Sequence, residues 1–175
     1  MHRRAFLAST AAVALGSTAV FMGRRPAAAR NERNENAKFE ITLTEEEWRE
    51  RLTPEQYHIL RDHGTERPFS SPLDDEERAG VFHCAGCDQE LYLSSTKFDS
   101  RTGWPSFWDD IKGKVGTSVD YKLIFPRTEV HCSRCGGHLG HVFKDGPAPT
   151  GDRHCLNGLS LTFKPSEEEE ATKQT

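Results

Sequence analysis

Two Cys-x-x-Cys pairs constrain the fold of this chain more than any other feature of its sequence. Cys84 and Cys87 form the first pair, Cys132 and Cys135 form the second, and 44 residues lie between them. Paired turns of this kind are typical of a structural tetrahedral site in which four thiolates hold one zinc ion. Two disulfides are the alternative in a chain that is exported. The paired spacing favours zinc, and we expect one structural zinc ion per chain.

Two capping boxes predict short helices at the start of the domain. Thr44 is followed three residues later by Glu47, and Thr53 is followed by Gln56 in the same way. Pro54 stands at the first helical position of the second segment, where its missing N–H costs nothing. Apolar residues at helical spacing follow both boxes.

From residue 81 onward the chain consists of short apolar runs separated by glycine and proline. We expect strands at 81–83, 91–93, 117–125, 128–131, 141–143, 154–157 and 159–163. Apolar residues make up 35% of the chain and the mean hydropathy is −0.70, so the core is small and benefits from a metal staple. The prediction is a mainly β (α+β) domain over residues 41–166, an antiparallel β domain with short helices at its start.

The N-terminal segment predicts export. Arg3 and Arg4 precede an apolar stretch at 11–23 that is short for a membrane helix, and three alanines at 27–29 would suit a cleavage site. Residues 1–29 therefore resemble a twin-arginine signal peptide, which places the protein in the periplasm. An uncleaved membrane anchor is the alternative. Residues 30–40 are expected to form a linker, and residues 167–175 an acidic, solvated tail.

The charge of the chain argues against a nucleic-acid partner. The formal net charge is −4, and loss of residues 1–29, which carry four arginines and no acidic residue, makes it −8. A domain this acidic lacks the electrostatic attraction that draws proteins to phosphate backbones. We also expect no stable membrane association after the signal is cleaved.

Cys155 is the fifth cysteine and is left over once the metal site is filled. If the chain around it is extended, Arg153 and Asn157 share its face, and His154 points to the other face. Arg153 would then lower the pKa of the thiol and favour the nucleophilic thiolate. Taken alone, a buried structural cysteine is an equal alternative.

Three further features could supply the rest of a catalytic site. His138 and His141 offer imidazoles that can donate a proton near neutral pH, and Asp145 could orient one of them. Trp104 and Phe107 lie in an aromatic loop that could wall an apolar pocket, although the sequence alone favours a place in the core.

Together these motifs resemble the B-type peptide methionine sulfoxide reductases. The resemblance runs from about residue 41 to 163 and rests on segments 98–107, 127–130, 138–147 and 153–157 and on both Cys-x-x-Cys pairs. It implies two antiparallel sheets stapled by a structural zinc, and reduction of the R epimer of methionine sulfoxide in peptides or proteins. It also implies a role for each of the following: Cys155 as nucleophile, Trp104 and Phe107 as substrate wall, and His138, His141, Asp145, Arg153 and Asn157 as the polar catalytic set.

One departure from the family pattern concerns recycling of the enzyme. Many members carry a resolving cysteine directly before Gly103, where this chain has Thr102, and no sixth cysteine exists. The resemblance therefore implies that a thioredoxin-like protein or another external thiol reduces the sulfenic acid on Cys155. A non-enzymatic, zinc-stapled β module that binds a ligand is the rival interpretation of the fold.

Overall fold

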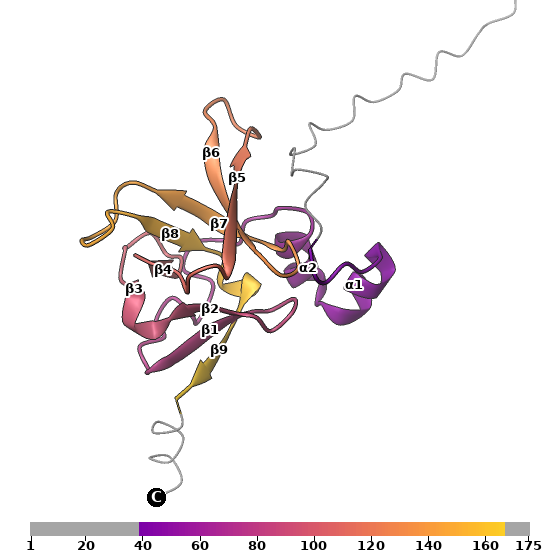
Figure 1. Cartoon of the computed structure of the whole chain (residues 1–175), viewed down its shortest axis with the longest axis horizontal. Coiled ribbons are helices and arrows are strands. Elements are labelled where there is room, and N and C mark those ends of the chain that lie inside the picture. The colour runs from indigo at the N-terminus through magenta and orange to yellow at the C-terminus, as the bar shows by residue number, and fades with distance from the viewer. Residues whose placement is uncertain (1–38, 167–175) are drawn as a thin grey trace, which may run out of the picture. The chain divides into compact units, whose positions relative to one another are not determined.

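The computed structural model describes residues 39–166. The expected signal peptide, nearly all of the expected linker and the acidic tail lie outside these residues. Within residues 39–166, no helix is both long enough and apolar enough to span a membrane. Figure 1 shows residues 39–166 in colour.

Two short helices open the domain, as the capping boxes predict. Helix α1 spans Glu45–Arg51 and α2 spans Pro54–Leu60, and both boxes form with their expected residues. The buried faces carry Trp48 on α1 and Ile59 and Leu60 on α2. Each helix is two turns long, so this buried face and the caps, rather than intrinsic propensity, hold it.

The strands form two antiparallel sheets. The smaller sheet has the order β2-β1-β9, with β1 at Gly80–Cys84, β2 at Glu90–Leu93 and β9 at Leu161–Pro165. The larger sheet has the order β3-β4-β8-β7-β6-β5. Its strands are β3 (Lys97–Phe98), β4 (Ser106–Phe107), β5 (Val115–Asp120), β6 (Arg127–Cys132), β7 (His138–Phe143) and β8 (Arg153–Leu156).

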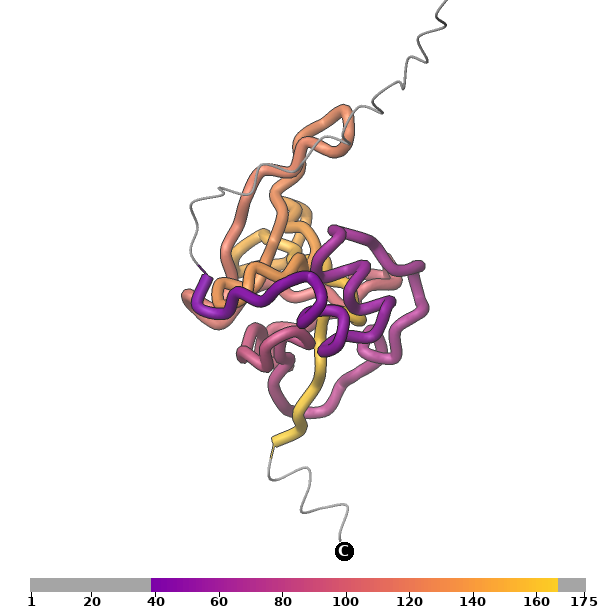
Figure 2. Tube along the Cα trace, turned by 90° about the vertical axis from the view of Figure 1, so that its right-hand side faces the viewer, coloured from indigo at the N-terminus to yellow at the C-terminus, as the bar shows by residue number. Residues whose placement is uncertain are grey.

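Every predicted strand overlaps an observed one, but several bounds differ. β7 begins before the expected segment 141–143, and the first two residues of the expected strand at 159–163 belong to a short 3-10 helix, Gly158–Ser160, that precedes β9. The expected strand at 117–125 ends at Asp120, because residues 121–126 turn the chain back into β6. The two-residue strands β3 and β4 were not predicted, since they are too short to show alternation. In Figure 2 the β5–β6 hairpin extends away from the rest of the domain.

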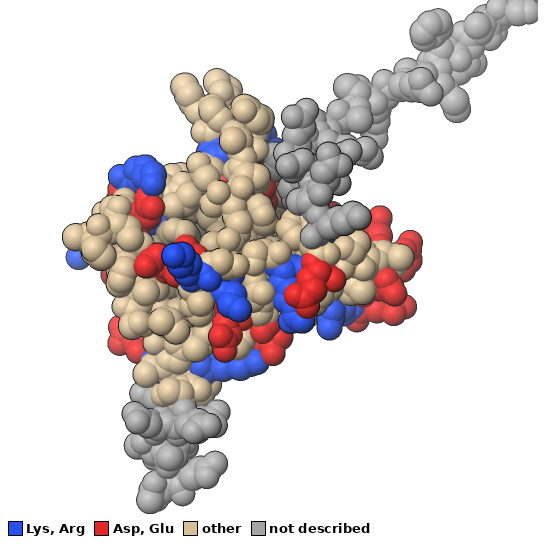
Figure 3. Space-filling view, viewed as in Figure 1, with Lys and Arg blue, Asp and Glu red and all other residues tan. Residues whose placement is uncertain are grey.

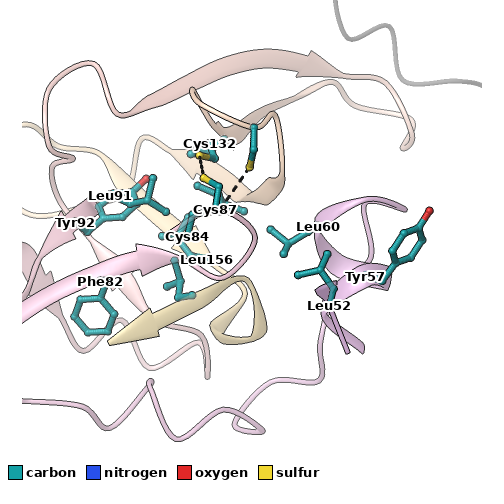
Figure 4. Packing of buried hydrophobic residues seen from close by; sticks show 14 of the residues in the cluster. Leu52, Tyr57, Leu60, Phe82, Cys84, Cys87, Leu91, Tyr92, Cys132 and Leu156 are labelled. Carbon is teal, nitrogen blue, oxygen red and sulfur yellow. Dashed lines mark hydrogen bonds between the residues drawn. The ribbon is translucent and has the colours of Figure 1, made fainter. Parts of the chain in front are cut away.

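The core lies between the two sheets and under α2. Phe107 of the larger sheet packs its ring against Phe82 and Tyr92 of the smaller sheet, at centroid distances of 4.9 and 4.6 Å. Leu60 of α2 and Leu156 of β8 belong to the same buried cluster. Figure 4 shows labelled members of this cluster, among them Leu60, Leu91 and Leu156, together with Cys84, Cys87 and Cys132, which belong to the same cluster.

Candidate active site and metal centre

The four paired cysteines meet at one point, where the two sheets come together. Cys84 ends β1 of the smaller sheet and Cys132 ends β6 of the larger one. All four sulfurs are buried and lie within 4.8 Å of one another. The sulfur of Cys84 lies 3.7 Å from that of Cys135, and the sulfur of Cys87 lies 3.5 Å from that of Cys132 (Figure 4).

The two cysteine turns have the same construction. The N–H of Asp88 donates to the carbonyl of Cys84, and that of Gly136 donates to the carbonyl of Cys132. Both of these donors have positive φ, 61° at Asp88 and 68° at Gly136. Glycine suits the second turn, because a Cβ there would also lie 2.4 Å from the ring of Phe39. The repeated turn presents two sulfurs from each sheet to a common centre.

These residues fit a zinc ion better than disulfides. Zinc with four sulfurs at 2.3 Å in tetrahedral geometry separates neighbouring sulfurs by about 3.8 Å, close to the two separations seen here. A disulfide needs about 2.05 Å, and all five cysteines are free thiols. The side-chain amide of Gln89 also donates toward the sulfur of Cys132 at 3.6 Å, as groups around metal-bound thiolates do.

Cys155 lies in β8, between β4 and β7. Its Cα is opposite Ser106 on β4 and opposite His141 on β7. The ladder continues from His141 to Glu129 on β6 and then to Ser118 on β5. Residues directly opposite one another point to the same face of a sheet and lie about 5 Å apart. A polar row therefore crosses the larger sheet, with Cys155 between Ser106 and His141.

A cavity of about 130 Å³ opens over this row. Gly140 permits the close approach of β7 to β8 beside the thiol, because a Cβ there would lie 2.1 Å from the carbonyl oxygen of Cys155. The lining residues are Thr65, Trp104, Arg127, Gly140, His141, Phe143, Cys155, Leu156 and Asn157. An apolar wall, a thiol and an imidazole thus meet in a space the size of one side chain.

Burial controls the protonation of Cys155. Removal from water raises the pKa of the thiol, and the charge of Arg153 and hydrogen bonds from Thr102, Arg153 and Ser106 only partly oppose this. The expectation that Arg153 favours the thiolate is thus right in sign, but burial outweighs it. In the free enzyme the thiol form is favoured at neutral pH.

His141 is held by Asp120. Nε2 of His141 lies 2.7 Å from Oδ2 of Asp120, and the same oxygen accepts a hydrogen bond from Arg127 at 2.7 Å. Burial alone would raise the pKa of Asp120, but hydrogen bonds from the Lys122 backbone, His141 and Arg127 lower it to about 2. Burial lowers the pKa of His141. A neutral His141 therefore donates from Nε2 to a carboxylate, which leaves Nδ1 as a proton acceptor.

His138 lies behind His141 and is not part of the cavity wall. Its ring centroid is 5.3 Å from that of His141. Its Nδ1 lies 2.7 Å from Oε1 of Glu129, which is also 2.9 Å from Nδ1 of His63. The hydroxyl of Ser118 donates to the other oxygen of the same carboxylate. Glu129 thus fixes the orientation of the ring that packs against His141.

Asp145 does not contact either of these histidines. It forms a two-pronged ion pair with Arg153, in which Nε and Nη2 each lie 2.9 Å from a carboxylate oxygen. The guanidinium stacks over Phe143 at 4.6 Å. The expectation that Asp145 orients an imidazole is wrong, because residue 145 follows the end of β7 whereas Asp120 faces His141 from across the sheet.

Asn157 and Glu66 join the two sides of the cavity. The amide nitrogen of Asn157 donates to the carbonyl of Leu139, and its oxygen accepts from the N–H of Glu66. The carboxylate of Glu66 accepts from the backbone of Gly158 and Leu159. The carbonyl of Glu66 also accepts from Nε1 of Trp104 at 3.3 Å, so one buried residue fixes Trp104 and the end of β8.

Phe107 and His154 lie on the opposite face of the sheet. Phe107 is fully buried in the core and is absent from the cavity lining, so it differs from the expected substrate wall. Its partner across the strands is His154, which contacts the hydroxyl of Tyr92 at 3.0 Å. The prediction that His154 points away from Cys155 is confirmed.

Comparison with known proteins agrees with this geometry. A family model, the SelR domain, matches residues 52–165. The peptide methionine sulfoxide reductase MsrB of Methanosarcina barkeri is 56% identical over 133 residues, which cover 75% of this chain and 94% of that protein. The chain belongs to the SelR-domain family, whose relatives are the MsrB enzymes.

Other MsrB proteins match over the same share of the chain. The enzyme of Agrobacterium fabrum is 53% identical and covers 71% of this chain and 93% of its own length. The chloroplastic peptide methionine sulfoxide reductase B1 of Arabidopsis thaliana is 53% identical, and the match covers 74% of this chain and 63% of that protein. The Yippee-like domain of Mis18 gives a TM-score of 0.40 at 18% identity, over 51% of this chain and 98% of that domain, which is too low to add to the assignment. Membership of an enzyme family does not favour the ligand-binding alternative.

Several residues of this site were not identified from the sequence. Thr65, Arg127 and Phe143 line the cavity, and Asp120, Glu129 and Glu66 hold its polar side chains in place. Glu129 has a weak signal, because a charged residue at the centre of a strand-like run requires a buried partner. Asp120 lies at the end of β5, inside the run taken as one long strand. Glu66 lies in a loop without a recognisable motif.

Proposed function

We propose that this protein reduces methionine-R-sulfoxide in peptides and proteins to methionine, and so repairs oxidised proteins. The observation that carries the proposal is the cavity in which Cys155, His141 and Trp104 meet, in a chain of the MsrB family. A space of about 130 Å³ suits one oxidised side chain. Trp104 and Phe143 offer apolar contact to the methyl group of that side chain. The imidazole of His141 lies on the strand next to Cys155.

The raised pKa of Cys155 and the lowered pKa of His141 make a neutral thiol and a neutral imidazole the starting state of the proposed reaction. The thiol gives its proton to Nδ1 of His141 as the substrate enters, and Asp120 stabilises the imidazolium that forms. The thiolate attacks the sulfoxide sulfur. The imidazolium returns the proton to the sulfoxide oxygen, which moves to Cys155 as a sulfenic acid while methionine leaves. The substrate sulfur gains two electrons and the cysteine sulfur loses two.

An external thiol completes the cycle in this proposal. Thr102 contacts Cys155 where many relatives would have a second thiol, and the other four sulfurs belong to the cysteine cluster. A thiol of a thioredoxin-like protein or of a small molecule attacks the sulfenic acid, which forms a mixed disulfide with Cys155 and releases water. A second thiol of the same reductant then attacks this disulfide and frees the Cys155 thiol. The four-cysteine site would hold one zinc ion with a structural role, since it joins the two sheets and takes no part in the steps above.

We also propose that residues 1–29 are a twin-arginine signal that sends the folded protein to the periplasm. The support is the sequence pattern alone. Fusion of residues 1–35 to a reporter that requires this pathway tests it, with Arg3→Lys/Arg4→Lys as the matched control. Retention of the wild-type fusion in the cytoplasm would rule out the signal, and sequencing of the exported N-terminus decides whether it is cleaved.

The decisive experiment for the activity compares separated R and S sulfoxide peptides with a chemical dithiol. Wild-type protein should reduce only the R form. Cys155→Ser should lose this activity, because serine is not a nucleophile toward sulfoxide under these conditions, and should keep its fold and metal content. Turnover by Cys155→Ser near that of the wild type would remove Cys155 from the mechanism.

A further inference from the structure

The tip of the β5–β6 hairpin exposes an unusual amount of apolar surface. Five of the eight exposed large apolar side chains among residues 39–166 lie within the seven residues 119–125, which we call the apolar tip. They are Val119 (48% exposed), Tyr121 (66%), Leu123 (59%), Ile124 (94%) and Phe125 (79%). Contiguous apolar surface of this kind marks an interaction site.

The apolar tip begins where the cavity wall ends. Asp120 lies within the tip at the end of β5, and Arg127 lies just beyond it on β6. Asp120 binds His141, and Arg127 lines the cavity. Lys122 fastens its base, because Nζ donates to the carbonyls of Asp62 and His63 in the loop that continues to the cavity wall. The apolar tip is thus an extension of the cavity rim.

The small size of the cavity determines where the rest of a peptide substrate must lie. The cavity volume of about 130 Å³ has room for one large side chain but not for a length of peptide main chain. The main chain of a peptide substrate and its neighbouring side chains must therefore lie outside, on the rim. Figures 2 and 3 show the hairpin projecting from the domain with a largely uncharged outer end. Its two charged side chains are both engaged: Asp120 with His141 and Arg127, and Lys122 with the loop carbonyls.

We propose that the apolar tip binds large apolar side chains next to the oxidised methionine of a peptide substrate, an inference that rests on the proposed function. An apolar partner is favoured because the tip offers apolar surface and no free charge to attract an acidic or basic segment. The consequence is a preference for sulfoxides in apolar sequence contexts, expressed through KM rather than kcat, since the tip does not touch the reacting atoms.

The test uses the variant Leu123→Ser/Ile124→Ser/Phe125→Ser and three R-sulfoxide substrates. These are N-acetylmethionine sulfoxide, a peptide with leucine and phenylalanine beside the sulfoxide, and the same peptide with serine and glycine there. Wild-type protein should prefer the apolar peptide by about tenfold in kcat/KM. The variant should lose that preference through KM and keep its rate on N-acetylmethionine sulfoxide. Leu93→Ser, an exposed leucine of the smaller sheet, is the matched control and should behave as wild type.

Several outcomes would overturn the proposal. Equal wild-type values of kcat/KM for the two peptides would show that the apolar tip does not bind the residues next to the sulfoxide. An equal loss on all three substrates would mean that the substitutions act through Asp120 or Arg127. Tip-dependent binding to phosphatidylcholine vesicles without any peptide preference would assign the surface to a membrane.

The proposed function can fail separately. If wild-type protein reduces no R-sulfoxide, anisotropy of a labelled, unoxidised apolar peptide still decides the role of the tip. Binding that is lost in the tip variant would support the docking surface, and its absence in the wild type would refute it.

Discussion

Nε2 of His141 lies 2.7 Å from Oδ2 of Asp120, although 21 positions separate the two residues. Asp120 ends β5 and His141 lies on β7, with β6 between them. The side chain of Asp120 is 3% exposed and also binds Arg127. This contact fixes the tautomer of His141 and directs its other nitrogen away from the carboxylate.

Asp120→Asn should impair both catalysis and stability. An amide cannot stabilise the imidazolium, so we expect kcat to fall by about tenfold or more. A carboxyl pKa lowered from 3.8 to about 2 contributes about 2 kcal/mol to folding above pH 4. Because the folded pKa is depressed, this contribution disappears as the pH falls toward 2. Urea unfolding should show a difference in the free energy of unfolding between wild type and Asp120→Asn at pH 7 that becomes smaller at pH 2.5. The control Asp62→Asn, which replaces an exposed carboxylate, should unfold with the same free energy as the wild type at both pH values.

The reactivity of Cys155 should depend on pH in the manner of a buried thiol. Since burial raises its pKa, alkylation by iodoacetamide should be slower at pH 7 than that of a small free thiol and should accelerate into the alkaline range. Arg153→Ala removes the opposing charge, so its alkylation curve should move to still higher pH. A curve for Arg153→Ala that moves to lower pH would contradict the assigned role of this arginine.

Purified protein should contain about one zinc ion per chain. Cys87→Ser and Cys132→Ser should each lose the metal and lower the melting temperature by about 10 °C or more, because the site joins the two sheets. Metal analysis and thermal unfolding measure both effects. Cys155→Ser, the matched control, should retain the zinc. Stoichiometric disulfides without metal would contradict the prediction.

Oxidised enzyme should stop at a sulfenic acid. One turnover without reductant should yield one methionine per chain and a Cys155 that reacts with dimedone. Thr102→Cys should form a disulfide with Cys155, because the Thr102 side chain lies close enough to that sulfur to lower the pKa of its thiol. Peptide mapping distinguishes the two products. A disulfide between Cys155 and Cys84, Cys87, Cys132 or Cys135 in the unmodified protein, with zinc released, would show that the metal site takes part in the cycle.

Features that depend on neighbouring residues could be predicted from the sequence. Both capping boxes formed at Thr44 and Thr53 because their bonds close within one helical turn. The alternation around Cys155 placed His154 on the opposite face, since extended chain has a period of two. The spacing of the paired cysteines sufficed to predict that all four would meet, because each turn is a local structure.

The pairing of side chains that are distant in the sequence follows from the tertiary structure. The register of β5, β6 and β7 brings Asp120 to His141, whereas Asp145, close in sequence, binds Arg153 instead. Phe107 is core because its strand turns that face toward Phe82 and Tyr92. Strand order and register follow from packing of the whole chain, and a shift of one residue would exchange the two faces. No local pattern contains that information.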